Sequence, residues 1–451
     1  MSNKIYPIGI QNFEKIRNDG YFYIDKTALM YQMVKTGSYY FLSRPRRFGK
    51  SLLISTLEAY FQGKKELFEG LAVEKLEKDW IKHPILHLDL NIEKYDTPES
   101  LDKILNDNLE YWESQYGTRP SETSFSLRFA GIIQRACEKT GQRVVILVDE
   151  YDKPMLQAIG NEELQKQFRN TLKPFYGALK TKDGYIKFAL LTGVTKFGKV
   201  SVFSDLNNLD DISMWNEYVE ICGVSEREIH ENLEAELHEF AAARGITYDK
   251  LCEDLRECYD GYHFTHNSIG MYNPFSLLNA FKRKEFGSYW FETGTPTYLV
   301  KLLKKHHYDL ERMAHEETDV QVLNSIDSES TNPIPVIYQS GYLTIKGYDE
   351  EFGMYRLGFP NREVEEGFIR FLLPFYANVN KVESPFEIQK FVREVRSGDY
   401  NSFFRRLQSF FADTTYEVIR DQELHYENVL FIVFKLLGFY TKVEYHTSEG
   451  R

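Results

Sequence analysis

Cysteine is scarce in this sequence, with four residues among 451. No two of them form a C-x-x-C pair, and no histidines accompany them at the spacing of zinc ligands. The four are Cys137, Cys222, Cys252 and Cys258. Their number and spacing argue against a zinc module or a disulfide framework, and they predict reduced thiols in the core of a cytoplasmic protein.

Long hydrophobic runs are also absent. No stretch reaches the ~18 consecutive apolar residues of a membrane span, and residues 1–7 contain no apolar core of a secretory signal. The formal net charge of −12 disfavours a uniformly basic nucleic-acid binder, although it is compatible with local basic patches. These absences predict a cytoplasmic protein without membrane contact.

The chain is instead rich in apolar and aromatic residues that follow regular patterns. Hydrophobic residues make up 42% and aromatic residues 15%, enough for sizeable cores in the two to four domains that 451 residues suggest. The first half alternates short apolar runs with longer amphipathic stretches, which is the α/β pattern of a parallel sheet covered by helices on both faces. It predicts strands at residues 38–42, 85–90, 144–148 and 186–191, and a helix at residues 51–62.

The pattern changes after about residue 215. Residues 225–243 have the charged amphipathic pattern of a helix, and helical patterns continue beyond them. Residues 335–345 alternate like a strand or hairpin, with residues 354–359 as the pairing partner. Helices followed by a β-hairpin predict a winged-helix-like module, and helical periodicity returns over residues 387–437.

The segment from Arg44 to Ser51 reads RPRRFGKS and lies between a predicted strand and a predicted helix. It follows the phosphate-binding pattern G-x-x-x-x-G-K-[ST], except that Arg44 replaces the first glycine. Gly49 permits a turn whose N–H groups face inward, Lys50 can reach the β- and γ-phosphates, and Ser51 can ligate Mg²⁺. The predicted nucleotide contacts of this P-loop are Arg47, Phe48, Gly49, Lys50, Ser51 and Leu52.

A second motif supplies the other half of this chemistry. Residues 144–148 form an apolar strand that ends in Asp149 and Glu150. Because parallel sheets bind ligands at the carboxyl ends of their strands, Asp149 is predicted to hold Mg²⁺ together with Ser51. Glu150 is predicted to orient or deprotonate the attacking water. The alternative is that both acids merely close the strand.

Other polar residues near this edge have more than one interpretation. Thr192, which follows the strand at residues 186–191, is predicted to be catalytic by sensing the γ-phosphate or holding the water, with Thr195 as second choice. For either hydroxyl, a simple β-turn role is an equal alternative. Asp152 either supports the site or is a solvated loop carboxylate. Three basic side chains could neutralise phosphates, meet an acidic partner or form ordinary surface pairs: Arg44, Arg46 and Arg47.

Several motifs together resemble a family of bacterial AAA-ATPase-like proteins across essentially the whole chain. They are YIDKT at residues 23–27, SRPRRFGKS at 43–51, LVDEYDKP at 147–154, LTGVTKF at 191–197, LNNL at 206–209, YDGY at 259–262 and WFETGTP at 290–296. Arginine in place of the first glycine is a feature of this family's loop. The resemblance implies that Asp25 lies near the nucleotide, whereas the sequence alone indicates a helix start with Thr27 as its cap.

Members of this family usually carry a C-terminal nuclease domain of the PD-(D/E)XK type, which uses an Asp and a Glu-x-Lys to hold a metal and activate water. By the resemblance these residues would follow Arg451, so residues 1–451 alone are not expected to cleave nucleic acid. Glu427 corresponds either to an auxiliary acidic residue or to a solvent-facing glutamate, and residues 441–445 correspond to the first strand of that domain. The expected domains are an AAA-like P-loop ATPase core at 1–215, a helical lid at 216–285, a winged-helix-like region at 286–380 and an incomplete nuclease-like domain at 381–451.

Three functions are compatible with these features. The first is a Mg-dependent ATPase that acts as motor or switch for a C-terminal nuclease-like effector on nucleic acid. The second is a nucleotide-operated switch with little turnover that controls a protein partner. The third is a DNA-binding module with a vestigial P-loop, which the acidic net charge disfavours. ATP and Mg²⁺ are the expected cofactors, and a homo-oligomer and a nucleic-acid contact of the C-terminal region are left open.

Overall fold

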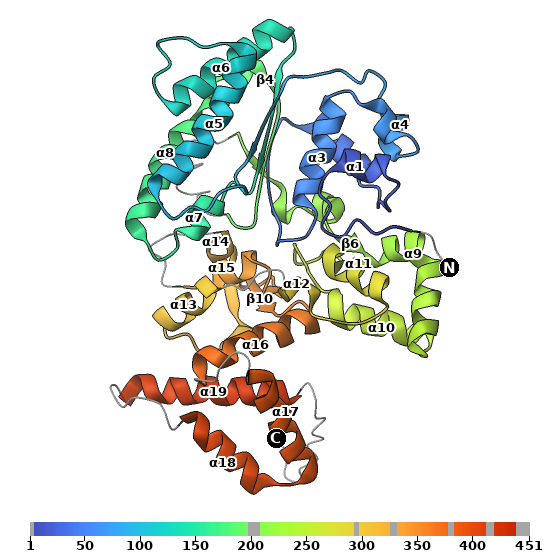
Figure 1. The fold of residues 1–451 in the computed structure, drawn as a ribbon, viewed down its shortest axis with the longest axis vertical. Helices are drawn as coiled ribbons and strands as arrows, with labels where there is room; N and C mark the ends of the chain where they lie inside the picture. The colour runs from blue at the N-terminus through green and yellow to red at the C-terminus, as the bar shows by residue number, and fades with distance from the viewer. Residues whose placement is uncertain are drawn as a thin grey trace.

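The computed structural model describes residues 4–196, 208–292, 297–324, 332–377, 383–411 and 419–438. The molecule is elongated, with a sheet-containing module at one end and three helices at the other (Figure 1). None of the described helices combines the length and the apolarity that a membrane crossing needs.

A five-stranded parallel sheet forms the centre of the N-terminal module, in the order β2-β3-β4-β1-β5. Its strands are β1 (Tyr39–Ser43), β2 (Ile85–Asp89), β3 (Val144–Asp149), β4 (Ile186–Gly193) and β5 (Asp210–Asp211). Every residue of β1 and β3 is buried, as expected of central strands that are covered on both faces. The four strands predicted from the apolar runs are therefore confirmed, and β5 is an additional short edge strand.

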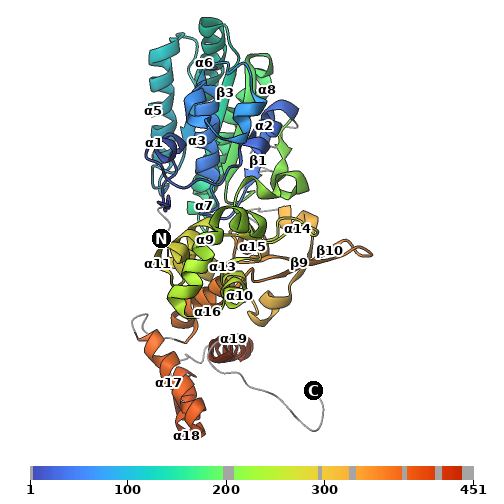
Figure 2. The same ribbon diagram turned by 90° about the vertical axis from the view of Figure 1, so that its right-hand side faces the viewer.

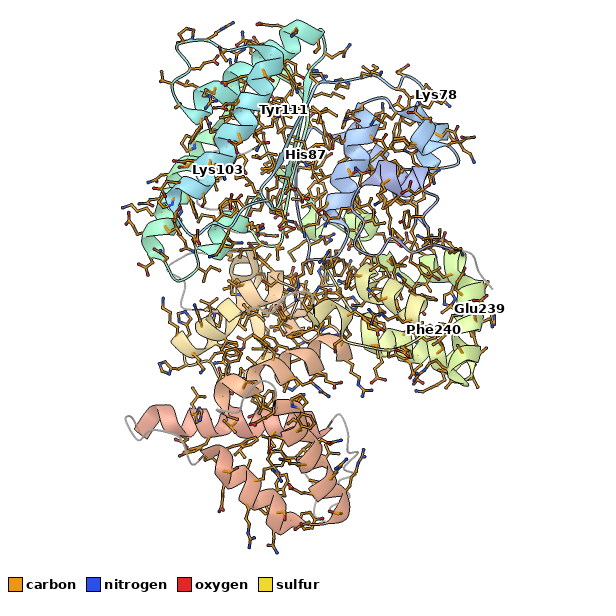
Figure 3. All side chains as sticks on the ribbon, viewed as in Figure 1. Lys78, His87, Lys103, Tyr111, Glu239 and Phe240 are labelled. Atoms are coloured by element: carbon orange, nitrogen blue, oxygen red, sulfur yellow. The ribbon has the colours of Figure 1, made fainter. Side chains whose placement is uncertain are left out.

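Helices cover both faces of this sheet, which confirms the predicted α/β fold class (Figures 1 and 2). One face carries α1 (Phe13–Asn18), α2 (Thr27–Thr36), α3 (Lys50–Phe61) and α4 (Ala72–Leu76). The other face carries α5 (Pro98–Tyr116), α6 (Phe125–Thr140) and α8 (Glu162–Thr181), while α7 (Lys153–Gln157) follows β3. His87 of β2 lies between the layers, whereas Lys103 and Tyr111 lie on the outer side of α5 (Figure 3).

The next segment packs around a small core of its own. It consists of β6 (Val224–Ser225), α9 (Glu226–Arg244), α10 (Tyr248–Tyr259), β7 (Met271–Tyr272) and α11 (Pro274–Arg283), whereas the preceding η4 (Asn216–Ile221) packs into the main core. The helix predicted over residues 225–243 is α9. It begins with a capping box, in which the Ser225 side chain accepts from the Glu228 amide and the Glu228 side chain accepts from the Ser225 amide. This reciprocal pairing explains why the helix starts directly after Ser225.

A mixed module follows and contains the antiparallel sheet β8-β10-β9. Its elements are α12 (Tyr289–Glu292), α13 (Thr297–Lys305), β8 (Glu317–Asp319), α14 (Val320–Asn324), α15 (Ile334–Gln339), β9 (Thr344–Asp349), β10 (Met354–Gly358) and α16 (Arg362–Tyr376). The predicted pairing of the second strand is confirmed, but the prediction of a strand over residues 335–345 is wrong except at its last two residues, Thr344 and Ile345, which begin β9. Residues 334–337 are buried without exception, so their apolar run marks the inside of the molecule and does not mark one face of a strand.

Three helices end the described chain: α17 (Ser384–Ser397), α18 (Tyr400–Phe411) and α19 (Ile419–Gly438). They match the helical periodicity predicted over residues 387–437. Glu427 is exposed on α19, as the solvent-facing alternative predicted. The strand predicted at residues 441–445 lies outside the described residues, and the four domain boundaries stay predictions.

Candidate nucleotide-binding site

The P-loop joins β1 to α3 at the carboxyl edge of the sheet. Gly49 precedes the first residue of α3 and has φ 100°, a left-handed conformation that residues with a Cβ rarely adopt. This turn directs the start of the 12-residue helix α3 at the cavity described below. A helix N-terminus favours anions through its unpaired N–H groups and its dipole.

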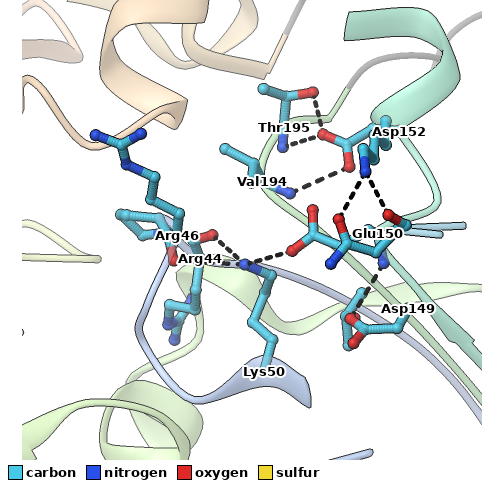
Figure 4. A network of polar contacts seen from close by, with 12 residues as sticks. Arg44, Arg46, Lys50, Asp149, Glu150, Asp152, Val194 and Thr195 are labelled. Atoms are coloured by element: carbon cyan, nitrogen blue, oxygen red, sulfur yellow. Dashed lines mark hydrogen bonds and ion pairs between the residues drawn. The ribbon is translucent and has the colours of Figure 1, made fainter. Parts of the chain in front are cut away.

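Lys50 is held inside the P-loop by three oxygen atoms (Figure 4). Its Nζ atom donates to the carbonyl oxygens of Arg44 at 3.1 Å and Pro45 at 3.4 Å, and it pairs with Glu150 Oε1 at 3.3 Å. Burial by itself would lower the pKa of the Lys50 ammonium, but the carboxylates of Glu150, Asp149 and Asp152 outweigh burial and raise it. Lys50 therefore stays charged and is positioned to meet a phosphate.

Asp149 and Glu150 lie at the end of β3, directly across from the P-loop. Asp149 is buried, and its Oδ1 atom accepts from the Thr192 hydroxyl at 2.6 Å and from the Glu150 amide at 3.1 Å. Glu150 has φ 53°, a strained conformation for a non-glycine residue that is common at functional sites. It turns the Glu150 carboxylate toward Lys50 and leaves it 19% exposed, within reach of solvent.

Thr192 is oriented toward the acidic strand end. Its hydroxyl is fully buried and donates to Asp149, so it does more than cap a turn. It does not line either cavity described below. The contact of Thr192 with the γ-phosphate or the water stays a prediction, and in the structure its hydroxyl fixes the Asp149 carboxylate.

A cavity of about 410 Å³ opens beside Lys50, a size that suits a small-molecule ligand. Its charged end is formed by the P-loop, the start of α3, Glu150 and Lys153. Of the predicted site residues, the cavity brings together Arg47, Gly49, Lys50, Ser51, Leu52 and Glu150. The sequence prediction missed the opposite wall, which is formed by residues 7–11 and by Pro274, Phe275 and Leu278 of α11.

A smaller apolar cavity of about 110 Å³ shares a wall with the first. The shared residues are Pro7, Gly49, Leu52, Pro274 and Leu278. The rest of its lining is mostly apolar and includes one charged side chain, Lys26. These residues are 22–24, Lys26, Met30, Phe48, Leu53, Thr56 and 221–224. The site therefore changes from charged to apolar along its length, which matches the distribution of charge in a nucleoside triphosphate.

The Phe48 side chain faces away from the phosphate end. Its ring packs edge-on against Tyr262 and Phe264, with ring centroids 4.8 Å and 5.6 Å apart, and its carbonyl accepts from the Gly223 amide. Phe48 lines only the apolar cavity. Its predicted contact with the nucleotide is thus restricted to the apolar end, and its main packing is with the C-terminal half of the chain.

Asp25 lies between Ile24 and Lys26, which line the apolar cavity, and its place near the nucleotide stays a prediction. Its Oδ1 atom accepts from the amide and the hydroxyl of Thr27, and its Oδ2 atom accepts from the Ala72 amide at 2.7 Å. Asp25 lines neither cavity. Its carboxylate thus accepts from the first backbone amides of α2 and of α4, where the sequence had assigned Thr27 as the cap.

Arg44 is a structural residue. Its guanidinium is buried and donates to the carbonyl oxygens of Ser43 at 2.9 Å, Ser213 at 2.8 Å and Tyr218 at 3.1 Å. It also stacks on the Phe264 ring at 3.9 Å. Burial lowers the pKa of Arg44 to about 10. None of the three predicted roles fits, because these contacts turn the charge away from the cavity.

The other two arginines line the cavity. Arg46 stacks on Trp290 at 4.6 Å, and its carbonyl accepts from the Trp290 indole N–H at 3.0 Å. Arg47 is exposed, with φ 65°, and lies 5.1 Å from the Phe275 ring. Both charges are thus positioned to face an anion, and Arg46 also touches the C-terminal half of the chain.

The donor set of the site suits Mg²⁺ completed by phosphate oxygens. Ser51 lines the cavity. Asp149 lines neither cavity, but it lies next to Glu150, which does, and its Oδ2 atom accepts no hydrogen bond from the described residues. Within the described part of the chain, no group of three or more His, Cys, Asp or Glu residues could hold a metal alone. Mg²⁺ commonly binds through one or two protein oxygens together with substrate phosphates, so these residues fit it.

Comparison with known proteins agrees with this geometry. Residues 7–203 match a family model described as "Predicted AAA-ATPase". A protein from Azotobacter chroococcum mcd 1, described as an uncharacterized protein in the vnfD 5′ region, is 35% identical over 465 residues. The match covers 100% of this chain and 86% of that relative.

A solved structure of the Aeropyrum pernix ORC2 protein in ADPNP and ADP complexes covers 74% of this chain and 87% of its own. It matches with 9% identity and a TM-score of 0.28, a similarity too low to indicate function. None of the three descriptions mentions a nuclease.

Proposed function

The chain belongs to the predicted AAA-ATPase family, and we propose that it is a Mg-dependent ATPase whose nucleotide state controls the arrangement of its C-terminal half. The observation that carries the proposal is the ion pair between Lys50 and Glu150 at the charged end of the cavity. It places the phosphate-binding cation and the candidate water-activating carboxylate 3.3 Å apart.

ATP would bind with its phosphates over Gly49, Lys50 and Ser51. The Lys50 ammonium would exchange the loop carbonyls and Glu150 for β- and γ-phosphate oxygens, and the start of α3 would supply N–H donors. Proline and aliphatic side chains at the other end would hold the base by packing. This orientation is supported by the change from charged to apolar lining.

Hydrolysis would use the strand end as the second half of the site. Ser51 and Asp149 would hold Mg²⁺, which when bound would neutralise charge on the phosphate oxygens. Glu150, released from Lys50 by the incoming phosphate, would orient and deprotonate the attacking water. Thr192 would keep Asp149 in position through the 2.6 Å hydrogen bond.

The switch part of the proposal is supported by contacts of the P-loop with the C-terminal half. Arg46 stacks on Trp290, Phe48 packs on Tyr262, and Pro45 lies too close to Gly341 for a Cβ to fit there. A loop that changes on binding phosphate would therefore move three distant segments. The nuclease-like effector, a contact with nucleic acid, a homo-oligomer and a cytoplasmic location stay predictions from the sequence.

A DNA-binding role for the winged-helix-like module is disfavoured by the position of α15. This helix is buried against the ATPase module, and its Gln339 side chain accepts from the Lys196 amide. A helix in this position has no free face to enter a DNA groove. A switch with little turnover remains the second candidate, because the same contacts would serve it without hydrolysis.

The test measures binding and turnover separately on the purified chain. Mg·ATP binding should change the fluorescence of Trp290, so Trp290→Phe should remove the signal. Trp112→Phe should keep it, because Trp112 is buried between α5 and α6 and lines neither cavity. Steady-state release of phosphate should be abolished by Glu150→Gln, and binding should be lost in Lys50→Ala. Binding without phosphate release would favour the switch. Unchanged ATP binding by Lys50→Ala would overturn both the ATPase and the switch.

A further inference from the structure

Two loops are fastened together behind the cavity: the acidic turn (residues 149–153) and the β4 loop (residues 192–196). The Tyr151 amide donates to the Thr192 carbonyl at 3.0 Å, and the Tyr151 hydroxyl donates to the Thr195 carbonyl at 2.9 Å. A Cβ at Gly193 would lie 2.6 Å from the Tyr151 ring and closer still to the Asp152 carboxylate. The two loops therefore approach as closely as glycine allows.

Asp152 occupies the centre of this contact. It is fully buried, and its two carboxylate oxygens accept three hydrogen bonds from the β4 loop (Figure 4). The Val194 amide donates to Oδ1 at 3.2 Å, and the amide and hydroxyl of Thr195 each donate to Oδ2 at 2.6 Å. Burying a carboxylate is costly unless such bonds satisfy it, so the position demands a specific arrangement of both loops.

The β4 loop touches the reacting end of the site in two places. Its first residue, Thr192, donates to Asp149, and Val194 lines the cavity beside Glu150. Asp152 itself lines neither cavity and follows Glu150 by two positions. Any shift of the β4 loop would thus move the carboxylate predicted to hold the metal and the wall next to the predicted water-activating group.

We propose that Asp152 is a positioning residue for ATP hydrolysis, which fixes the β4 loop so that Thr192 orients Asp149 and Val194 closes the cavity beside Glu150. The inference rests on the proposed function. It explains why a carboxylate, and not an amide, occupies this position. An amide has one acceptor oxygen and one donor nitrogen, so at least one of the three loop donors would face another donor.

This role makes a prediction that a purely structural carboxylate would not. Displacing catalytic groups by a fraction of an ångström lowers the rate of the chemical step far more than it weakens binding of the ground state. Asp152→Asn should therefore lower kcat for Mg·ATP hydrolysis by roughly ten-fold or more while KM changes less than about three-fold. Thr195→Val should do the same, and Thr195→Ser, which keeps the hydroxyl, should restore most of the rate.

The matched control is Glu77→Gln. Glu77 is also a buried carboxylate, its Oε1 atom accepts from the amides of Lys78 at 2.8 Å and Asp79 at 2.9 Å, and it lines neither cavity. It should lower the melting temperature and leave kcat unchanged. Comparing Asp152→Asn with Glu77→Gln therefore separates a loss of stability from a loss of positioning.

Each result decides the proposal. A kcat for Asp152→Asn within about three-fold of wild type, or an equal loss of kcat in Glu77→Gln, would overturn it. If Asp152→Asn does not fold, Thr195→Val and Thr195→Ser carry the test, and equal rates for these two would overturn the proposal. If the folded wild-type chain did not hydrolyse Mg·ATP, this result would overturn the proposed function and also the positioning role of Asp152.

Discussion

The backbone N–H of Lys196 donates to the Gln339 Oε1 atom at 2.5 Å and joins the β4 loop to α15. The Lys196 ammonium adds a hydrogen bond to Asn324 at 2.6 Å and an ion pair with Asp211 at 2.9 Å. The same loop begins at Thr192, which bonds to Asp149. A continuous polar path thus runs from the candidate metal ligand to the module that contains α15.

Gln339→Ala should weaken the docking of α15. It leaves the Lys196 amide and the Leu323 carbonyl without their side-chain partner, at a cost of about 1–3 kcal/mol for each buried group. Hydrogen exchange in α15 should become faster and less dependent on bound nucleotide. Gln165→Ala is the control, because this buried glutamine bonds to Met155 within the ATPase module. Equal effects of both substitutions on α15 would contradict the path.

Arg44→Gly restores the first glycine of the phosphate-binding pattern but should destabilise the folded protein. The carbonyls of Ser213 and Tyr218 lose a buried charged donor, so the free energy of unfolding should fall by about 3 kcal/mol or more. Because the guanidinium points away from the cavity, the Kd for ATP of the folded fraction should change little. Thermal melts and nucleotide titrations measure the two effects separately, and a stable variant with tighter binding would contradict this role.

The sequence predicted those parts of the site that are formed by residues adjacent in the chain. Lys50 after a tight turn and two acids after an apolar strand are recognisable because neighbouring residues define them. The role of Arg44 was not predictable, since two of its partners, Ser213 and Tyr218, follow it by 169 and 174 positions. The opposite wall of the larger cavity was missed for the same reason, because it comes from residues 7–11 and from α11, which only the fold brings together.

Asp25→Ala should separate stability from nucleotide binding. Its carboxylate accepts from the first backbone amides of α2 and of α4, so its loss should lower the free energy of unfolding by about 1–2 kcal/mol. Affinity for ATP should stay within about two-fold of wild type, because Asp25 lines neither cavity. A calorimetric titration checks the second point. A large loss of affinity in a folded variant would support the expectation drawn from the family resemblance.

Glu150→Gln should bind ATP more tightly than wild type although it does not hydrolyse it. In the free protein the Glu150 carboxylate pairs with Lys50 at 3.3 Å and competes with phosphate for it. A neutral amide competes less, and a partly exposed ion pair contributes up to about 1 kcal/mol, so affinity should rise by up to about five-fold. Glu163→Gln, an exposed change of the same charge on α8, should have no effect. Weaker binding by Glu150→Gln would contradict this competition.

Asp152 should make the stability of the protein depend on pH in a specific direction. Burial and the neighbouring Glu150 raise the pKa of Asp152 in the folded chain to about 7, from 3.8. Between these values the folded state binds the additional proton, so the contribution of Asp152 to the free energy of unfolding falls as pH rises, by up to about 1.4 kcal/mol per pH unit. The other charged or titratable groups around it are Lys50, Tyr151 and Tyr176.

Asp152→Asn removes this titration and leaves most other groups in place. The stability difference between wild type and Asp152→Asn should therefore shrink as pH rises from 5 to about 7 and should change little above that. Denaturant unfolding of both chains without nucleotide, at matched ionic strength, measures the difference directly. Glu77→Gln should show a flat difference over pH 5–7 and the opposite trend below the ordinary glutamate pKa of 4.5. Tyr60, Lys35 and backbone amides outweigh burial and hold the pKa of Glu77 down at about 2, so its stabilising contribution grows as pH rises through the acid range. A constant difference for Asp152→Asn across pH 5–7 would show that this carboxylate is ionised throughout the range.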